Sequence, residues 1–248
     1  MSLDEFVREF NASLDEKNMV IFTGAGLSTA SGIKDFRGEH GLYKENINAE
    51  EILSHDYFVE HPEEFYSFYR EKLINDGIKP NIMHEVIQEL QEKGYVSGVI
   101  TQNIDGLDTM AGTKDVVELH GNANSFYCNK CKKKYSLSDI ESMDLVPKCE
   151  CGGIIRPNIV LYQEPLDMFT LQSARSKVEY AKNMLVLGSS LKVNPAAALV
   201  HDFIVNKKLK KSKKLFIINK GETDYDYFAD YKYDGDLIEV AKKIKKLK

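Results

Sequence analysis

Five short and largely apolar runs are spread along the chain, and each is long enough for one buried strand. They are residues 19–23, 96–101, 116–119, 184–187 and 215–218. Such compact apolar runs are typical of strands that are covered on both faces of a sheet. Segments with helical spacing of apolar residues separate or flank them, namely 2–17, 82–93, 170–182, 195–206 and 237–246. Strands that alternate with helices predict the α/β class, with a doubly wound parallel sheet.

Two stretches interrupt this alternation. Residues 34–80 are rich in aromatic and acidic side chains and have helical periods, whereas residues 123–157 contain all four cysteines. Both are longer than an ordinary connection between a strand and a helix. We therefore expect two inserts that together form a smaller module over one edge of the sheet.

Composition narrows the class of protein and its ligands. Hydrophobic residues make up 43% of the 248 positions and charged residues 29%, as in ordinary globular proteins. No apolar run approaches the roughly 18 residues of a membrane-spanning helix, and the acidic N-terminus lacks the pattern of a secretory signal, so we expect a cytoplasmic protein without a membrane partner. The net charge of −5 argues against nucleic acid as the main ligand.

The chain contains one basic run, Lys207–Lys214. We interpret it as a solvated helix end and loop; a docking patch for an acidic partner is the alternative.

The four cysteines form two close pairs. Cys128 and Cys131 are separated by two residues, and Cys149 and Cys151, 17 residues further on, by one. Clustered thiols in a reducing compartment favour a metal over disulfides. The spacing predicts one structural, tetrahedral zinc ion with four protein ligands and no open position for chemistry. Four free thiols are the alternative.

Small or polar residues follow every one of the five apolar runs. Because the carboxyl ends of parallel strands meet at one edge of a sheet, these residues are predicted to converge on one ligand site. The candidates are Gly24, Ala25, Gly26, Ser28 and Thr29 after the first run; Gln102, Asn103, Ile104 and Asp105 after the second; His120 after the third; Gly188, Ser189 and Ser190 after the fourth; and Asn219 and Lys220 after the last.

The glycine-rich loop is suited to a phosphate group. Backbone amides of Gly24-Ala25-Gly26 can approach a diphosphate, with hydroxyl donors close behind; a simple tight turn is the alternative. Thr29 occupies the third glycine position of the dehydrogenase pattern, so a dinucleotide site without the usual hydride-transfer layout is indicated. Asp35, Phe36 and Arg37 follow. Arg37 could clamp a phosphate and Phe36 could cover a flat heterocycle, or the three could form a surface turn.

Three residues are candidates for the chemistry itself. Asn103 and Asp105 lie two apart after a strand, so both can face one side of a cleft, where an amide could fix a water or a ribose and a carboxylate could stabilise positive charge. His120 follows a strand and precedes Gly121, which leaves its ring accessible as a general base near neutral pH. The other five histidines are interpreted as structural or exposed.

Taken in order, these motifs resemble the sirtuin family of NAD-dependent protein lysine deacylases. The resemblance rests on Gly24-Ala25-Gly26-Leu27-Ser28, Gly32-Ile33-Lys34-Asp35-Phe36-Arg37, Thr101-Gln102-Asn103-Ile104-Asp105, His120-Gly121, the paired cysteines, Arg156-Pro157-Asn158-Ile159-Val160, Gly188-Ser189-Ser190-Leu191 and Asn219-Lys220-Gly221-Glu222-Thr223. It implies a Rossmann-like NAD-binding domain over 1–33, 81–122 and 158–248. A helical module with the cofactor-binding loop (34–80) and a zinc-binding module (123–157) would form the small domain.

The resemblance also implies an activity. NAD is consumed: the carbonyl oxygen of an acyl-lysine in a protein or peptide substrate attacks C1′ of the nicotinamide ribose, and nicotinamide leaves. The final products are free lysine and O-acyl-ADP-ribose. His120 matches the general base, and Asn103 and Asp105 match residues that order the nicotinamide and ribose. Further matches to cofactor contacts are Ala25, Thr29, Phe36, Arg37, Gln102, Ile104, Ser189, Ser190, Asn219, Asp236 and Leu237. Val160, with Tyr162, lies in the segment that pairs with the substrate backbone.

The chain departs from the family pattern at three positions. Lys34 replaces a usual Pro, Cys149-x-Cys151 is one residue short, and Gln163 replaces a frequent Gly. Family members that prefer succinyl-lysine or malonyl-lysine carry a Tyr and, three residues later, an Arg. When Tyr66 is aligned with that Tyr, Arg70 comes one residue too late. On a helix, Arg70 should therefore point away from the acyl channel. Two other functions remain open: a mono-ADP-ribosyltransferase, and a zinc-ribbon binding module with a vestigial nucleotide fold. The complete catalytic set favours deacylation.

Overall fold

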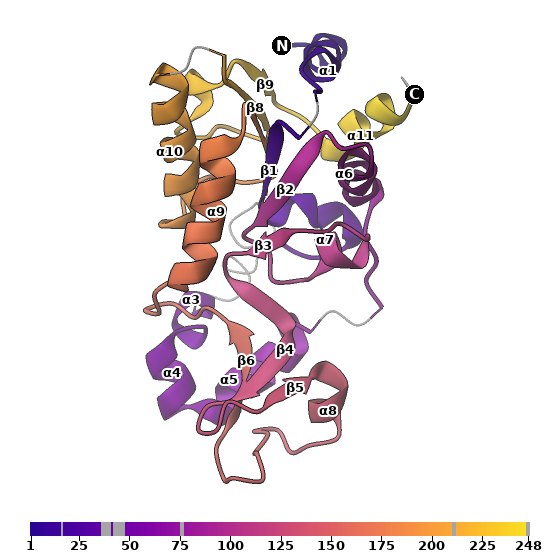
Figure 1. Cartoon of the computed structure of the whole chain (residues 1–248). Coiled ribbons are helices and arrows are strands. Elements are labelled where there is room, and N and C mark those ends of the chain that lie inside the picture. The colour runs from indigo at the N-terminus through magenta and orange to yellow at the C-terminus, as the bar shows by residue number, and fades with distance from the viewer. Residues whose placement is uncertain (16, 36–40, 42–47, 75–76, 210–211, 247–248) are drawn as a thin grey trace.

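The large domain is built on a six-stranded parallel sheet (Figure 1). The structure is a computed structural model that describes residues 1–15, 17–35, 41, 48–74, 77–209 and 212–246. The strand order is β3-β2-β1-β7-β8-β9, which is the Rossmann order. Their bounds are β1 (Met19–Thr23), β2 (Val96–Thr101), β3 (Val116–Glu118), β7 (Asn183–Leu187), β8 (Lys214–Ile218) and β9 (Tyr231–Tyr233). The predicted α/β fold with a doubly wound sheet is confirmed.

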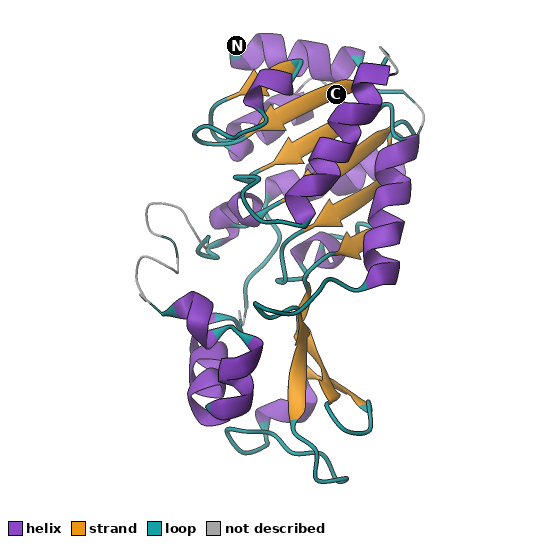
Figure 2. Cartoon of the chain, turned by 90° about the vertical axis from the view of Figure 1, so that its left-hand side faces the viewer, coloured by secondary structure: helices purple, strands orange, loops and turns teal. Residues whose placement is uncertain are grey.

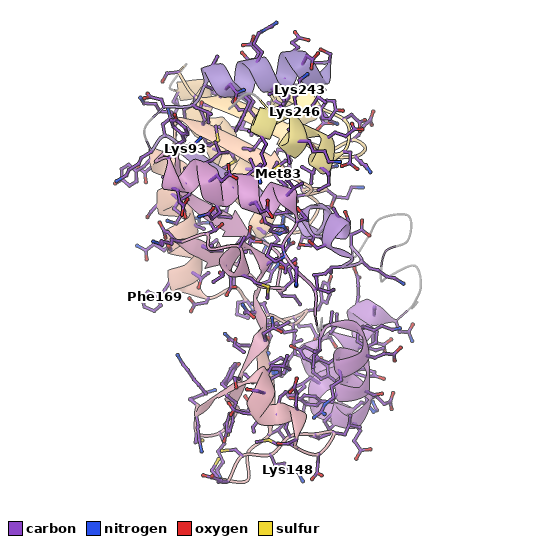
Figure 3. All side chains as sticks on the ribbon, turned by 90° about the vertical axis from the view of Figure 1, so that its right-hand side faces the viewer. Met83, Lys93, Lys148, Phe169, Lys243 and Lys246 are labelled. Atoms are coloured by element: carbon purple, nitrogen blue, oxygen red, sulfur yellow. The ribbon has the colours of Figure 1, made fainter. Side chains whose placement is uncertain are left out.

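Helices cover both faces of this sheet (Figure 1), and Figure 3 looks onto one of these faces, where Met83 and Lys243 are labelled. α1 (Leu3–Ala12), α6 (Ile82–Glu92) and α11 (Leu237–Lys246) pack on one face, and α9 (Met168–Tyr180) and α10 (Ala196–Leu209) on the other. Successive residues of β1 serve the two cores in turn: Ile21 belongs to the first and Phe22 to the second, and both are fully buried. Burial on both faces explains why the strands are continuously apolar.

The sheet differs from the sequence-based expectation at two places. The first helix was expected to reach residue 17 but ends at Ala12, because the chain must turn into β1 and Lys17 adopts a left-handed conformation with φ 46°. Strand β9 was not expected. Its three residues are only partly buried, and it pairs with β8 at the edge of the sheet.

The small domain joins the two inserts (Figure 2). Its helices are α3 (Ala49–Ile52), α4 (His55–Glu60) and α5 (Pro62–Lys72), and its antiparallel sheet has the order β5-β4-β6. The strands are β4 (Gly121–Cys128), β5 (Lys134–Ser136) and β6 (Ile155–Ile159), with α8 (Leu137–Glu141) beside them. One apolar core contains residues of both inserts. The predicted ends of the zinc-binding module, residues 123 and 157, fall inside β4 and β6, which continue without a break. These module boundaries therefore stay predictions.

The basic run is partly built into the fold. Lys213 is buried, and its ammonium donates to the carbonyl of Glu179 at 2.9 Å near the end of α9. A cation at the carboxyl end of a helix satisfies carbonyls that lack amide partners and complements the helix dipole. Lys207 pairs with Asp230 at 2.5 Å. Lys210 and Lys211 lie outside the described residues.

Among the described helices, none combines the length and apolar character that crossing a bilayer requires.

Candidate active site

A cavity of about 860 Å³ lies at the carboxyl ends of β1, β2, β7 and β8, beside the small domain. Most predicted site residues line it: Gly24, Ala25, Gly26, Thr29, Asp35, Gln102, Asn103, Ile104, His120, Val160, Tyr162, Gly188, Ser189, Ser190, Asn219, Lys220, Asp236 and Leu237. Ser28 and Asp105 do not line the cavity: Ser28 accepts from Asn103 in the wall, and Asp105 accepts from Ser28. Phe36 and Arg37 fall outside the described residues. The convergence of strand ends on one site is therefore observed.

The glycine-rich loop packs tightly against the loop after β7. It begins with the 3-10 helix η1 (Ala25–Leu27) directly after β1, and the Gly26 amide donates to the Gly188 carbonyl at 2.8 Å. Gly188 has φ +59°, and a Cβ there would lie 2.5 Å from the Gly26 carbonyl carbon. A side chain at Gly188 would therefore push the two loops apart. Only glycine permits the close approach of the loops that shapes this part of the cavity.

His120 has one ring nitrogen fixed and the other available. Its Nδ1 lies 2.8 Å from the Gln102 carbonyl oxygen. A carbonyl can only accept, so Nδ1 carries the proton and Nε2 keeps its lone pair. Burial lowers the pKa of the imidazole, and the hydrogen bond to Gln102 offsets part of that effect. At neutral pH the ring is thus held as the neutral tautomer that a general base requires.

Asn103, which lines the cavity, and Asp105, which does not, belong to one polar network. The Asn103 amide donates to the Gly24 carbonyl at 3.1 Å and to the Ser28 hydroxyl at 3.2 Å. That hydroxyl donates to Asp105 at 2.7 Å, and the Leu107 amide donates to the same carboxyl at 2.9 Å. Burial raises the pKa of Asp105, and these two hydrogen bonds oppose the rise. The carboxylate thus orients Asn103 through Ser28.

A second carboxyl, Asp108, lies behind this network and was not predicted. It sits in the short helix α7 (Leu107–Met110) and is 3% exposed. Burial raises its pKa to about 7; the charge of Asp105 acts in the same direction, and hydrogen bonds to Thr101 and Thr23 oppose it. The two threonine hydroxyls are 2.7 Å apart. Only its position shortly after Asp105 marked it in the sequence.

The far end of the cavity is formed by the loops after β7 and β8. Gln102 donates to the Ser189 hydroxyl at 2.7 Å. Lys220 and Asp236 form an ion pair at 3.0 Å, and Asp236 also accepts the Ile238 amide at 2.7 Å at the start of α11. These contacts join side chains from separate segments, each predicted as a site residue, into one wall of the cavity.

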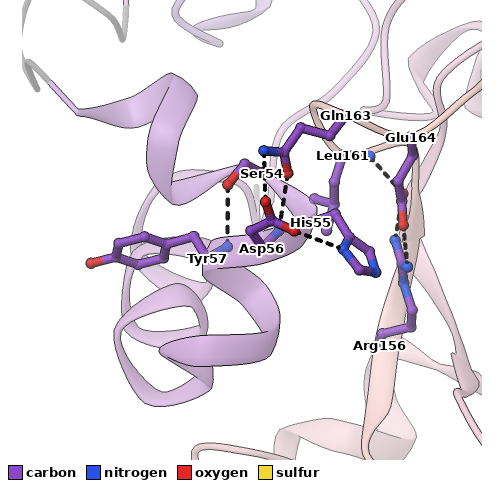
Figure 4. A network of polar contacts seen from close by, with 8 residues as sticks. All are labelled: Ser54, His55, Asp56, Tyr57, Arg156, Leu161, Gln163 and Glu164. Carbon is purple, nitrogen blue, oxygen red and sulfur yellow. Dashed lines mark hydrogen bonds and ion pairs between the residues drawn. The ribbon is translucent and has the colours of Figure 1, made fainter.

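The segment after β6 docks on both domains. Val160 donates its amide to the His120 carbonyl at 2.9 Å, and the Tyr162 amide donates to Leu53 at 2.9 Å. Arg156, 5% exposed, donates to both carboxylate oxygens of Glu164 at 2.6 and 2.9 Å (Figure 4). A bidentate ion pair of this kind is rigid, so the segment that carries Val160 and Tyr162 has a fixed path.

Sequence reasoning missed several parts of the wall. Apolar side chains from the small domain, Leu53 and Leu73, line the cavity, as do Val193 and Asn194 after β7 and Glu222 after β8. Glu222 lies within a quoted motif, and the loop after β7 could have been extended beyond Ser190. No local pattern marked the two leucines, because only the packing of the inserts brings them to the site.

The four cysteines fit a tetrahedral zinc ion. Their sulfur atoms all lie within 4.8 Å of one another. Cys128 and Cys151 Sγ are 3.4 Å apart, and Cys131 and Cys149 Sγ 3.6 Å. Four sulfurs at about 2.3 Å from one zinc would be about 3.8 Å apart, so little adjustment is needed, and the short Cys149-x-Cys151 spacing is accommodated. The set would supply all four ligands, and it lies outside the cavity.

The aromatic helix α5 does not reach the cavity. Tyr66 and Tyr69 are fully buried and donate to the carbonyls of Ile155 and Ala123. Arg70 donates to the Asp144 carbonyl at 2.8 Å, in the zinc-binding region. Arg70 therefore points away, as expected. The ring of Tyr66, the residue aligned with the Tyr of the succinyl-preferring members, belongs to the small-domain core.

Comparison with known proteins gives a consistent result. The family model described as the Sir2 family matches residues 24–195. An NAD-dependent protein deacetylase of Clostridium tetani is 46% identical over 215 residues, which is 84% of each chain. A solved Sir2 structure with a p53 peptide and NAD+ is 41% identical, with a TM-score of 0.87 over 100% of this chain and 98% of that one. Another, with a deacetylated p53 peptide and 3′-O-acetyl-ADP-ribose, is 42% identical, with a TM-score of 0.89 over the same shares.

Proposed function

Because the chain belongs to the Sir2 family, we propose that it is an NAD-dependent protein lysine deacylase that removes acetyl and related acyl groups. The observation that carries the proposal is the single cavity shared by the glycine-rich loop, His120 and the Val160–Tyr162 segment. These features correspond to a place for a dinucleotide, a base and a peptide strand. NAD supplies the electrophilic ribose carbon, which accepts the acyl oxygen as nicotinamide leaves.

His120 is proposed to hold and move the proton in this reaction. Its Nε2 is the free basic atom, because Nδ1 is committed to the Gln102 carbonyl. The lowered pKa keeps the ring neutral before the reaction. The ring can therefore take a proton from a ribose hydroxyl in the cavity, and the carbonyl of Gln102 stabilises the cation that results.

The loops around the cavity are proposed to bind NAD. The Gly24–Gly26 loop would hold the diphosphate, and Asn103, oriented by Ser28, would face the nicotinamide and its ribose. Ser189, Asn219 and the Lys220–Asp236 pair, all predicted cofactor contacts, would contact the adenosine portion. Asp35 lines the same cavity.

The substrate is proposed to enter beside the small domain. Val160 and Tyr162 would pair with an extended peptide by strand addition, and the acyl group would lie against Leu53, Leu73 and Ile104. An apolar wall favours an uncharged acyl chain, because burying a carboxylate without a partner is costly. The zinc ion would have a structural role only, because four thiolates leave no open coordination position.

One assay separates this proposal from its alternatives. Nicotinamide release is measured from NAD with and without an acetyl-lysine peptide. A deacylase needs both and forms O-acetyl-ADP-ribose, a mono-ADP-ribosyltransferase labels protein without consuming the acetyl group, and a binding module releases nothing. Release that does not depend on the peptide would overturn the proposal. A cytoplasmic location is also proposed, since the cysteines are arranged as metal ligands, which suits a reducing compartment.

A further inference from the structure

Gln163 occupies a turn position that normally favours glycine. The Glu164 amide donates to the Leu161 carbonyl at 3.0 Å, so residues 161–164 form a turn. Gln163 is its third residue, with φ +75°. Left-handed backbone is unfavourable for a residue other than Gly or Asn. Something must therefore hold this residue in place.

The side chain of Gln163 supplies that restraint through helix α4 (Figure 4). Its Nε2 donates to Asp56 Oδ2 at 3.0 Å, and its Oε1 accepts the Asp56 backbone amide at 3.1 Å. Asp56 lies in the first turn of α4, where backbone amides have no partner within the helix. The amide is thus satisfied from another segment of the chain.

The neighbouring backbone makes the same connection. The His55 amide donates to the Tyr162 carbonyl at 3.0 Å, and the Tyr57 amide donates to the helix's own Ser54 hydroxyl at 3.2 Å. Two of the first three amides of α4 are therefore satisfied by Tyr162 and Gln163. The turn that follows the proposed peptide-pairing segment is docked directly on the helical module.

We propose that Gln163 is a positioning residue for the acyl-lysine peptide, acting through its clamp on Asp56. The inference rests on the proposed function and names the residue that holds the Val160–Tyr162 segment ready for the substrate backbone. Without the clamp, the turn must be ordered when the peptide binds, and that cost appears as weaker peptide binding. The proposed NAD contacts and His120 lie on other elements, so we expect them to be unaffected.

The chain offers a matched control in Gln91 of helix α6. Its side chain also makes two hydrogen bonds to one residue: it donates to the Lys114 carbonyl and accepts the Lys114 amide, both at 2.6 Å. Gln91→Ala therefore removes the same number of contacts from the large domain, away from the cavity. It reports the effect of lost stability alone.

The test compares steady-state kinetics of Q163A, Q91A and the wild type with one acetyl-lysine peptide. For Q163A we expect the KM for peptide to rise about threefold to tenfold, the scale of two exposed hydrogen bonds, while kcat and the KM for NAD change less than twofold. Q91A should match the wild type in all three constants. D56A should also raise the KM for peptide, because it removes the bond from Gln163 Nε2. It should add nothing in the Q163A background, where that bond is already lost.

An unchanged peptide KM in Q163A, or an equal rise in Q91A, would overturn the positioning role. Full additivity of D56A and Q163A would do the same. Hydrogen exchange of the Asp56 amide tests the clamp without substrate: faster exchange in Q163A supports it, and unchanged exchange refutes it. If the wild type released no nicotinamide with peptide and NAD, the proposed function would fail, and the exchange result would still decide the clamp.

Discussion

Replacing Asp108 by Asn should stabilise the protein, and the gain should grow with pH. The carboxyl is buried behind Asn103 and Asp105, and its Oδ1 has no hydrogen-bond partner among the described residues. Burial raises its pKa to about 7 from the ordinary value of 3.8. Asn has nearly the same shape and never ionises, so the substitution removes the charge with little change in packing.

The magnitude follows from proton linkage. Between pH 3.8 and about 7 the folded protein keeps a proton on Asp108 that the unfolded chain has released. The free energy of unfolding of the wild type therefore falls as pH rises through this window. A shift of about three pKa units at 1.36 kcal/mol each corresponds to about 4 kcal/mol. D108N should match the wild type near pH 4 and exceed it by up to about 4 kcal/mol at pH 8.

Urea unfolding at half-unit steps from pH 4 to pH 8 measures this difference. Asp144→Asn, which removes an exposed carboxyl from the zinc-binding region, controls for the loss of one negative charge. The D108N difference should increase steadily between pH 4 and pH 7 and then level off. A difference that is constant with pH, or one that shrinks as pH rises, would refute the reasoning, because a raised pKa can only act in the stated direction.

Three further predictions concern the chemistry. His120→Ala should lower kcat by about 10²–10⁴-fold, the usual contribution of a general base, and calorimetry should find NAD affinity retained. The control His201→Ala, on the exposed face of α10, should change neither kcat nor NAD affinity. Turnover of His120→Ala near the wild-type rate would exclude His120 as the base. Elemental analysis should find one zinc per chain, and Cys128→Ser should lose the metal and the small-domain fold, as followed by circular dichroism; metal-free protein with full activity would contradict this. Acetyl-lysine should be processed with a higher kcat/KM than succinyl-lysine in the same peptide, because Arg70 points away from the cavity; the reverse order would disprove the apolar assignment.

The large domain could be predicted because its strands are buried on both faces. A strand such as β1, whose residues enter two cores in turn, must be apolar throughout, so its sequence marks it plainly. Strand β9 carries no such mark. Tyr231–Tyr233 is short and partly exposed, and it is defined by hydrogen bonds to β8 rather than by burial. Pairing at a sheet edge leaves little trace in a hydrophobic pattern.

The same distinction applies to the site. Residues that directly follow strands, such as His120 and Ser189, could be placed because sheet topology brings strand ends together. Leu53 and Leu73 could not, since their place on the wall depends on how two inserts share one core. Asp108 also escaped prediction. Its raised pKa comes from burial beside Asp105. The four residues of α7 are too few to show a pattern from which burial could be predicted.

His120 links the two halves of the site by two hydrogen bonds. Its ring donates to the Gln102 carbonyl, 2.8 Å away at the end of β2, and its own carbonyl accepts the Val160 amide at 2.9 Å. The position of the base relative to the proposed peptide segment is therefore set within one residue and does not depend on the orientation of the domains. A rotation of the helical module would move Leu53 and the Gln163 turn while leaving the base in register with Val160. Peptide binding and proton transfer should thus respond to different substitutions, which is why we expect changes at Gln163 in KM and changes at His120 in kcat.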